Sequence, residues 1–257
     1  MAFLELGYRK GSIRMKIAIF GANGPTGRIL TAQALDAGHS VTAVTRRPRD
    51  FPLRATGLGV VGADVYNFEE VDAVVEGKDA ILSALGVPYS RQPITVYSAG
   101  TGNIIRAMDS HGVRRLVCVS SSATDTTGGP HGGFFFDRVL QPLVTKLLGR
   151  TLYEDMRRME TAVAASGLDW TIMRPSGLFE TESVTDYRMA VDYINGIFAS
   201  RTDLADSMLR QLTSDEFVRK TVAVATFAQK PGLVQLLVHE ASSKKAAPDK
   251  VPEGKRS

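Results

Sequence analysis

The stretch Gly21-Ala22-Asn23-Gly24-Pro25-Thr26-Gly27 decides the fold because of its place in the chain. The apolar run 16–20 before it predicts a buried strand, and residues 26–37 after it have the spacing of a helix. The first glycine permits a tight exit from the strand, the second lets backbone N–H groups approach a pyrophosphate, and the third lets the helix pack closely. A strand, a glycine-rich turn and a helix in this order predict a dinucleotide-binding site.

Strands and helices continue to alternate after this turn. Short apolar or β-branched runs predict further strands at 40–44, 58–61, 80–85, 116–120 and 170–173. Helices are predicted over 69–76 and 96–110, each with a glycine close behind it. Near-continuous apolar strands are buried on both faces, and their alternation with helices indicates parallel strands joined by right-handed crossovers. The predicted fold class is α/β, a doubly wound parallel (Rossmann) sheet with helices on both faces.

The length of 257 residues and a composition that is 44% hydrophobic and 23% charged allow one α/β domain with a full core. We expect a single NAD(P)-binding domain over 15–240, in which about 176–240 forms a small C-terminal substrate-binding region. Residues 1–14 are predicted to be an N-terminal extension, and residues 241–257 a disordered basic tail. Met1 and Met15 are both candidates for the start of the chain.

The net charge of +4 is concentrated at the two ends of the chain, which leaves its body nearly neutral. This argues against a nucleic-acid partner, because a binding face for nucleic acid needs clustered Lys and Arg. No apolar run reaches the length of about 18 residues that a membrane span needs, and no secretory signal is recognisable. The single cysteine, Cys118, lies in an apolar run, which favours a packing role and a cytoplasmic location. The four histidines lack metal-ligand spacing, so no metal site is predicted.

The end of the second predicted strand bears on the choice of cofactor. NAD-binding proteins usually place Asp or Glu there against the ribose hydroxyls, whereas this chain has Thr45-Arg46-Arg47-Pro48-Arg49. The guanidinium of Arg46 suits the 2′-phosphate of NADP(H), and a solvated basic loop is the alternative. After the third strand, Asp64 and Val65 are candidates for the edge of the adenine, with a helix cap as the alternative role of Asp64. The predicted cofactor is NADP(H).

Several segments together carry a resemblance to a known family. They are GANGPTG at 21–27, TRRP at 45–48, GADV at 62–65, the run 84–93, HGVRRLVCVSSSA at 111–123 and SGLDWTIMRPSGL at 166–178. With these segments the chain resembles the atypical short-chain dehydrogenase/reductases over roughly residues 15–225. In pattern it is similar to the flavin-reductase (biliverdin reductase B) branch and to the NmrA-like NAD(P)H-binding proteins.

The resemblance implies catalytic residues by position. In the flavin-reductase branch a serine after the fifth strand lies beside the nicotinamide, and Ser121 has that position here, while the histidine of that branch falls on Glu160. The wider superfamily uses Tyr-x-x-x-Lys, and this chain has Tyr153 with Arg157 in place of the lysine. A tyrosine acts as an acid or base near neutral pH when a nearby cation lowers its pKa, and Arg157 could supply that field. Ser121 and Tyr153 are the candidate catalytic residues, with an ordinary helix aromatic as the alternative role of Tyr153.

The candidate cofactor contacts lie in the turn and at the strand ends. They are Gly21, Asn23, Gly24, Pro25, Thr26, Gly27, Arg46, Asp64, Val65, Leu85, Gly86 and Pro175. Arg174, next to the last of these, lies where related proteins hold the nicotinamide end of the cofactor. Its alternative role is a buried ion pair, with Glu160 as the candidate partner.

Two functions remain open. The first is an NADPH-dependent reductase of a small flat or carbonyl-bearing molecule such as a flavin, biliverdin, a quinone or an aldehyde, which the serine favours. The second is a non-catalytic, NmrA-like NADP(H) sensor that binds a partner protein, which the missing lysine favours.

The glycine-rich loop 124–133 and the apolar stripe within 139–148 predict either a lid or subunit-contact helix or an ordinary core helix. We expect a monomer or a homodimer.

Overall fold

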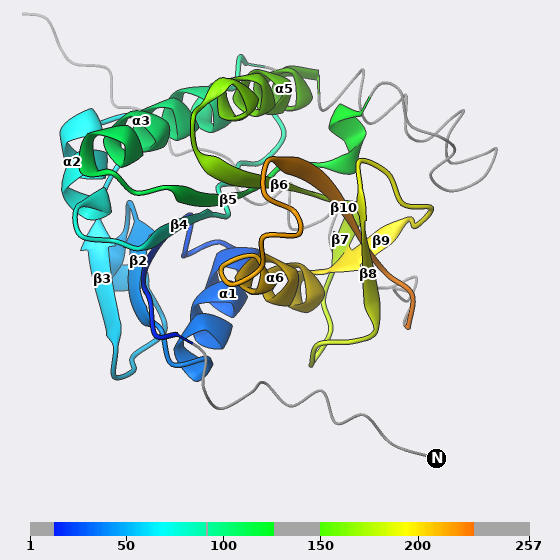
Figure 1. Ribbon diagram of the computed structural model, residues 1–257, viewed down its shortest axis with the longest axis horizontal. Coiled ribbons are helices and arrows are strands. Elements are labelled where there is room, and N and C mark those ends of the chain that lie inside the picture. The colour runs from blue at the N-terminus through cyan, green and yellow to red at the C-terminus, as the bar shows by residue number, and fades with distance from the viewer. Residues whose placement is uncertain (1–12, 91, 126–149, 229–257) are drawn as a thin grey trace, which may run out of the picture.

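An eight-stranded sheet forms the centre of the fold, in the strand order β3-β2-β1-β4-β5-β6-β10-β8 (Figure 1). The computed structural model describes residues 13–90, 92–125 and 150–228. Neighbouring strands of this sheet run parallel, except that β8 is antiparallel to β10. The strands are β1 (Lys16–Phe20), β2 (Ser40–Thr45), β3 (Leu58–Gly62), β4 (Ala80–Ser83), β5 (Arg115–Val119), β6 (Asp169–Pro175), β8 (Tyr187–Val191) and β10 (Lys220–Thr226). A separate two-stranded parallel sheet pairs β7 (Gly177–Phe179) with β9 (Phe198–Ser200).

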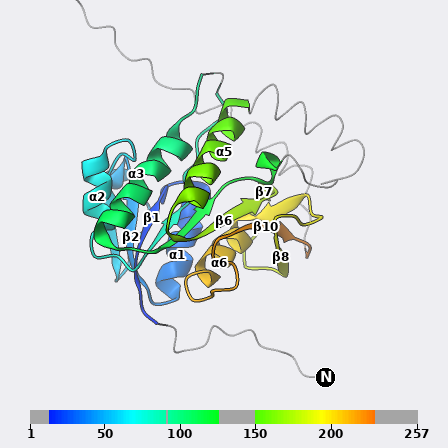
Figure 2. The same ribbon diagram turned by 45° about the horizontal axis from the view of Figure 1, so that its top comes forward.

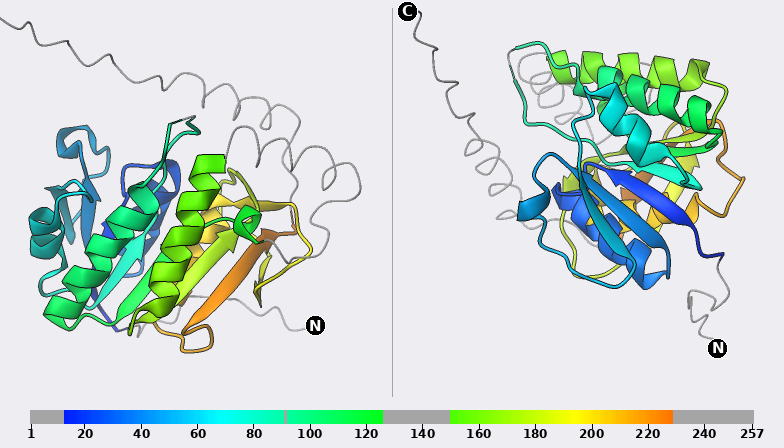
Figure 3. Two further views of the ribbon diagram at one scale, coloured as in Figure 1. Left: turned by 90° about the horizontal axis from the view of Figure 1, so that it is seen from above. Right: turned by 90° about the vertical axis from the view of Figure 1, so that its left-hand side faces the viewer.

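Helices cover both faces of the large sheet, as the two views of Figure 3 show. One face carries α2 (Phe68–Val75), α3 (Val96–His111) and α5 (Arg150–Ala165), and the other carries α1 (Pro25–Asp36) and α6 (Arg201–Arg210). Short 3-10 turns, η1 (Pro48–Asp50) and η2 (Ser122–Thr124), follow β2 and β5. Alternate residues of β1 enter the two cores, with Ile17 on the α1 side and Ala18 on the α3 side. The central strands are therefore buried on both faces, as their apolar sequences predict.

The predicted doubly wound fold is confirmed, and the ends of the predicted elements differ by no more than two residues. The main difference lies after residue 176, where the sequence analysis placed a smaller substrate-side region. Strands β10 and β8 from that part of the chain extend the large sheet beyond β6, and α6 covers one of its faces, so among the described residues after 176 only β7 and β9 form a separate sheet (Figure 2). The predicted extension 1–14 (apart from its last two residues), most of the loop 124–133, the stripe within 139–148 and the tail 241–257 lie outside the described residues. None of the helices that are described has the length and apolar character needed to cross a bilayer.

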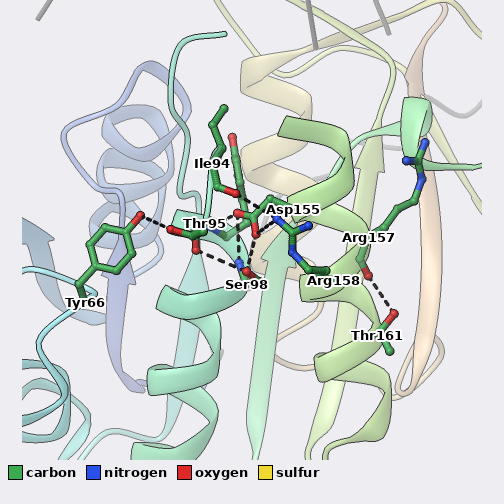
Figure 4. A network of polar contacts seen from close by, with 9 residues as sticks. Tyr66, Ile94, Thr95, Ser98, Asp155, Arg157, Arg158 and Thr161 are labelled. Atoms are coloured by element: carbon green, nitrogen blue, oxygen red, sulfur yellow. Dashed lines mark hydrogen bonds and ion pairs between the residues drawn. The ribbon is translucent and has the colours of Figure 1, made fainter. Parts of the chain in front are cut away.

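A buried carboxylate joins the two long helices on one face of the sheet (Figure 4). Asp155 of α5 is fully buried, and its carboxylate accepts hydrogen bonds from the backbone N–H groups of Tyr97 (2.8 Å) and Ser98 (3.3 Å) and from the Ser98 hydroxyl. Arg158, one turn further along α5, donates to the same carboxylate at 3.1 Å. The N-cap residue of α3, Thr95, makes no side-chain cap of its own. Asp155 therefore caps α3 from a neighbouring helix and fixes the position of α5.

We expect Asp155→Ala to lower the free energy of unfolding by about 1–3 kcal/mol, because it removes a cap and leaves buried N–H groups unsatisfied. Urea unfolding measures this loss. Glu154→Ala is the matched control, because Glu154 is the preceding residue of the same helix and its exposed carboxylate pairs with the exposed Arg150. Equal stability of the Asp155 variant and the control would contradict the capping role.

Candidate cofactor and substrate site

The turn between β1 and α1 leaves room for a side chain at only one of its three glycines. Gly21 has a φ of +73°, and a Cβ there would collide with the backbone of Ala84 at the end of β4. A Cβ on Gly27 would collide with the Gly21 carbonyl oxygen and with the backbone of Ala22. A Cβ on Gly24 would meet only the Gly21 carbonyl oxygen, at 3.3 Å. Gly24 therefore borders open space, as a position that a phosphate approaches requires.

The N-terminus of α1 suits an anion. Gly24 is its N-cap residue and no side chain caps it, while Pro25 occupies the first helical position, where a missing N–H is harmless. The backbone N–H groups of Thr26 and Gly27 thus have no acceptor within the helix, and the helix dipole adds partial positive charge. The amide oxygen of Asn23 accepts from Arg28 at 3.0 and 2.7 Å, which holds this cation beside the turn. These features fit the pyrophosphate of a dinucleotide.

Arg46 lies directly after β2 and is exposed. Its neighbour Arg47 forms an ion pair with Asp50 at 3.7 Å, whereas Arg46 pairs with no carboxylate in the described parts of the chain. The guanidinium of Arg46 is therefore available to a phosphate group at the carboxyl end of β2.

Asp64 and Val65 follow β3 at the same edge of the sheet. The Asp64 carboxylate accepts from the backbone N–H of Tyr66 at 3.1 Å, which makes a local turn. The cap of α2 is Asn67, whose side chain accepts from two N–H groups of the first turn of that helix, so the alternative role of Asp64 as the helix cap is wrong. The Val65 side chain is buried in the core beside α3, which leaves Asp64 and the backbone to border a ligand.

The remaining candidate cofactor contacts also lie at strand ends. Leu85 and Gly86 follow β4, and Pro175 is the last residue of β6. Because these strands are parallel, their carboxyl ends meet at one edge, and the strand order reverses there between β1 and β4. Open α/β sheets bind ligands at such a switch point. The structure therefore brings all the candidate cofactor residues to one edge of the sheet.

Ser121 and Tyr153 lie near each other at the end of β5. Ser121 begins the η2 turn, where its hydroxyl accepts from the Ala123 N–H at 3.2 Å. Tyr153 lies in the first turn of α5 and is buried, with its hydroxyl 3.0 Å from the hydroxyl of Tyr89. The Ser121 side chain lies close enough to the Tyr153 phenol to lower its pKa through a hydrogen bond. Tyr89 is 47% exposed, so three hydroxyl groups form a series from the strand end to the surface.

The pKa of Tyr153 is raised above its ordinary value of 10. Burial is the main cause, the neighbouring Tyr89 adds to the rise, and the hydrogen bond with Ser121 opposes it. Arg157 is not among the groups that shift this pKa, and its Nε donates to the Thr124 carbonyl at 3.1 Å. Tyr153 holds its proton near neutral pH and can donate a hydrogen bond there.

The buried ion pair predicted for Arg174 is present. Its guanidinium donates twice to Glu160, with Nε to Oε1 at 2.9 Å and Nη2 to Oε2 at 2.8 Å. The two side chains are 16% and 11% exposed. The Thr124 hydroxyl donates to the same carboxylate at 2.9 Å. This network fixes η2, α5 and β6 to one another beside the hydroxyl groups of Ser121 and Tyr153.

Sequence reasoning missed two residues of this region. Tyr89 lies in the irregular loop after β4, where no periodic pattern marks a functional aromatic residue. Arg201 begins α6 and donates to the Thr26 hydroxyl at 3.0 Å. The sequence does contain a pattern that predicts the start of α6, because Ser200 followed three residues later by Asp203 is typical of a helix N-cap. In the structure the Ser200 side chain accepts a hydrogen bond from the Asp203 N–H.

Cys118 is fully buried in β5, and burial raises its pKa to about 12. A thiol with such a pKa is not a nucleophile near neutral pH. Among the residues that the structure describes, no group of three or more His, Cys, Asp or Glu side chains is arranged to hold a metal ion.

The fold and the strand-end site define a Rossmann protein of the nucleotide-binding type. The chain belongs to the NAD(P)H-binding family, whose sequence model matches residues 21–215. This match confirms the predicted NAD(P)H-binding family, and a short-chain dehydrogenase/reductase among the solved structures shares the fold.

Individual relatives are distant. The sugar epimerase YhfK of Bacillus subtilis, itself described as uncharacterized, is 28% identical over 204 residues, which are 77% of this chain and 88% of that protein. An uncharacterized protein of Mycobacterium tuberculosis is 34% identical over 108 residues, which are 42% of this chain and only 12% of the relative's own length. A short-chain dehydrogenase/reductase from Veillonella parvula in complex with NADP has a TM-score of 0.71 at 18% identity, covering 85% of this chain and 100% of that chain.

The different surroundings of the glycines give a prediction. Gly24→Val should abolish NADPH binding and leave the melting temperature of the cofactor-free protein within a few degrees, because its side chain would occupy the space of the pyrophosphate. Gly27→Ala should lower the melting temperature, because its Cβ would collide with backbone. Fluorescence titration and thermal melts test both. Failure of the Gly24 variant to fold would mean that this glycine is mainly structural.

Proposed function

We propose that this protein is an NADPH-dependent reductase of a small flat or carbonyl-bearing molecule, of the flavin, biliverdin, quinone or aldehyde type. The observation that carries the proposal is the pair of hydroxyl groups from Ser121 and Tyr153 at the end of β5, beside the candidate cofactor edge. A nicotinamide cofactor, when bound, supplies a hydride. The chain then needs to orient the substrate, exclude water and present a proton-bearing group.

Ser121 and Tyr153 have complementary parts in this proposal. The Tyr153 phenol stays protonated near neutral pH because its pKa is raised, so it acts as a hydrogen-bond donor and not as a base. In this proposal Ser121 donates to the reducible group of the substrate, where negative charge develops during reduction. A donor aimed at developing charge stabilises the transition state more than the bound substrate. Tyr89 connects this pair with solvent.

Ser121→Ala should lower the rate of reduction of a carbonyl substrate by about a hundredfold to a thousandfold, as removal of one such donor typically does. NADPH affinity should stay unchanged. A flavin reduced by direct contact with the nicotinamide should show a loss of less than about tenfold, because its proton can come from water. NADPH consumption with a panel of flavins, biliverdin, quinones and aldehydes measures these rates. Ser166→Ala, at the opposite end of α5, is the control and should leave the rates unchanged.

Tyr153 adds a pH test to the same panel. Because the pKa of its phenol lies above the ordinary value of 10, the rate should show no alkaline loss from this group between about pH 7 and 10. Tyr153→Phe should lower the rate without creating a new titration. An alkaline limb near pH 8 that disappears in the Phe variant would show that a cation lowers this pKa after all.

The cofactor preference rests on Arg46. We expect NADPH to bind about tenfold to a hundredfold more tightly than NADH, because a charge-assisted hydrogen bond to the 2′-phosphate has no counterpart in NADH. Arg46→Ala should remove most of that preference and leave the affinity for NADH nearly unchanged. Arg47→Ala is the control, because that side chain pairs with Asp50. Equal dissociation constants of the wild type for the two cofactors, in titration, would refute the preference.

A second candidate function is a non-catalytic NADP(H) sensor. The raised pKa of Tyr153 and the hydrogen bond from Arg157 to the Thr124 carbonyl favour it, because in the described part of the chain no cation lowers the pKa of this phenol toward neutral pH. Tight NADPH binding with no turnover of any member of the panel would decide for the sensor. A partner protein whose retention differs between NADP⁺ and NADPH would support it.

A further inference from the structure

A buried arginine lies beside the phosphate-binding turn. Arg201 is the first residue of α6 and is only 9% exposed, and its Nη1 donates to the Thr26 hydroxyl at 3.0 Å. Among the described residues it forms no ion pair, and the exposed Glu180 acts on it only from a distance. A guanidinium stays charged in proteins, and a buried charge without a partner is unfavourable. Arg201 therefore holds a buried positive charge next to Thr26 that no described carboxylate pairs with directly.

The position of Arg201 is fixed by a network of its own. The fully buried carboxylate of Asp203 accepts from the backbone N–H and the hydroxyl of Thr185, at 2.7 and 2.8 Å, and from the Thr226 hydroxyl. Helix α6 packs along α1 (Figure 1), and the Gln33 side chain of α1 donates to the Thr202 carbonyl at 3.1 Å. The first turn of α6 therefore lies against α1, which it contacts at Gln33 through the Thr202 carbonyl and at Thr26 through the Arg201 side chain.

The hydrogen bond from Arg201 sets the direction of the Thr26 hydroxyl. A hydroxyl has one donor hydrogen and two acceptor lone pairs. Because a lone pair of the Thr26 oxygen is used by Arg201, its hydrogen points elsewhere, and no described residue accepts it. Thr26 lies in the first turn of α1, whose uncapped N–H groups already suit a pyrophosphate. A donated hydrogen bond to an anion from the same residue would complete this arrangement.

We propose that Arg201 is a positioning residue for the dinucleotide, which turns the Thr26 hydroxyl toward the pyrophosphate and supplies a buried positive charge beside it. The proposal rests on the nucleotide-binding part of the proposed function and does not depend on catalysis. It also links the structure after β6 to the cofactor, because Arg201 follows β9 directly. The charge of Arg201 is buried, so its contribution is screened less by salt than that of the exposed Arg46.

The test compares ligands with and without a pyrophosphate. Arg201→Met should weaken the binding of both NADPH and NADH by about tenfold or more, the loss expected for one charge-assisted hydrogen bond. The affinity for 2′-AMP, which lacks the pyrophosphate, should not change. Arg46→Ala should give the opposite pattern, with a loss for NADPH and 2′-AMP only. Raising the salt concentration should reduce the effect of Arg46→Ala more than that of Arg201→Met.

Thermal stability separates this role from a structural one. Arg201→Met should not lower the melting temperature of the cofactor-free protein, because an apolar side chain of similar length replaces an unpaired buried charge. It should reduce the rise in melting temperature that NADPH causes. Arg201→Lys should recover part of the affinity because it restores the charge. Arg210→Met, on the same helix but paired with Asp206 at the surface, is the control and should bind normally.

A double-mutant cycle tests the route through Thr26. Thr26→Val keeps the shape of the side chain and removes the hydroxyl, so its effect on NADPH affinity should be much smaller when Arg201 is already Met. Wild-type affinity of Arg201→Met for both dinucleotides, or an equal loss for 2′-AMP, would overturn the proposal. Absence of turnover with the expected binding pattern would reject the reductase and leave the role of Arg201 standing.

Discussion

Direct contact between backbone segments in the turn 21–27 is the constraint on which the rest of the structure depends. A Cβ at Gly21 would collide with the backbone just after β4, and a Cβ at Gly27 would collide with the backbone of the turn itself. Because Gly21 and Gly27 have no side chains, the end of β1 can approach the end of β4, and α1 can begin at the point where the strand order reverses. The N-terminus of α1 and the carboxyl ends of the strands are thereby brought to the same edge.

Two carboxylates, those of Asp155 and Glu160, fix the position of helix α5 by pairing with different parts of the fold. Asp155 joins it to the N-terminus of α3, and Glu160 joins it to β6 through Arg174 and to η2 through Thr124. Such groups are costly to bury alone, but each of these carboxylates has several donors around it. Tyr153 therefore sits on a helix whose position is fixed on both sides. That fixed position allows a phenol to stay close to Ser121.

The sequence predicted the elements that follow from local patterns. Strands β1, β2, β4, β5 and β6 are apolar runs because helices cover both faces of the sheet there, and the glycine-rich turn has a fixed place between a strand and a helix. The same reasoning missed β7 and β9, which have three residues each, because so short a run has no recognisable period. It also missed β8, an edge strand that is only partly buried and so lacks a continuous apolar pattern.

The sequence by itself determined the class of fold, the phosphate-binding turn and the basic strand end at Arg46, because each of these rests on neighbouring residues. Tertiary structure alone decided which side chains meet. Tyr153 lies near Ser121 and Tyr89, Arg157 turns to the Thr124 carbonyl, and Arg201 reaches Thr26 across 175 residues of sequence. Burial and hydrogen bonding set the protonation of the phenol and the direction of the Thr26 hydroxyl. Both depend on the packing of distant helices against one edge of the sheet, which no local pattern in the chain encodes.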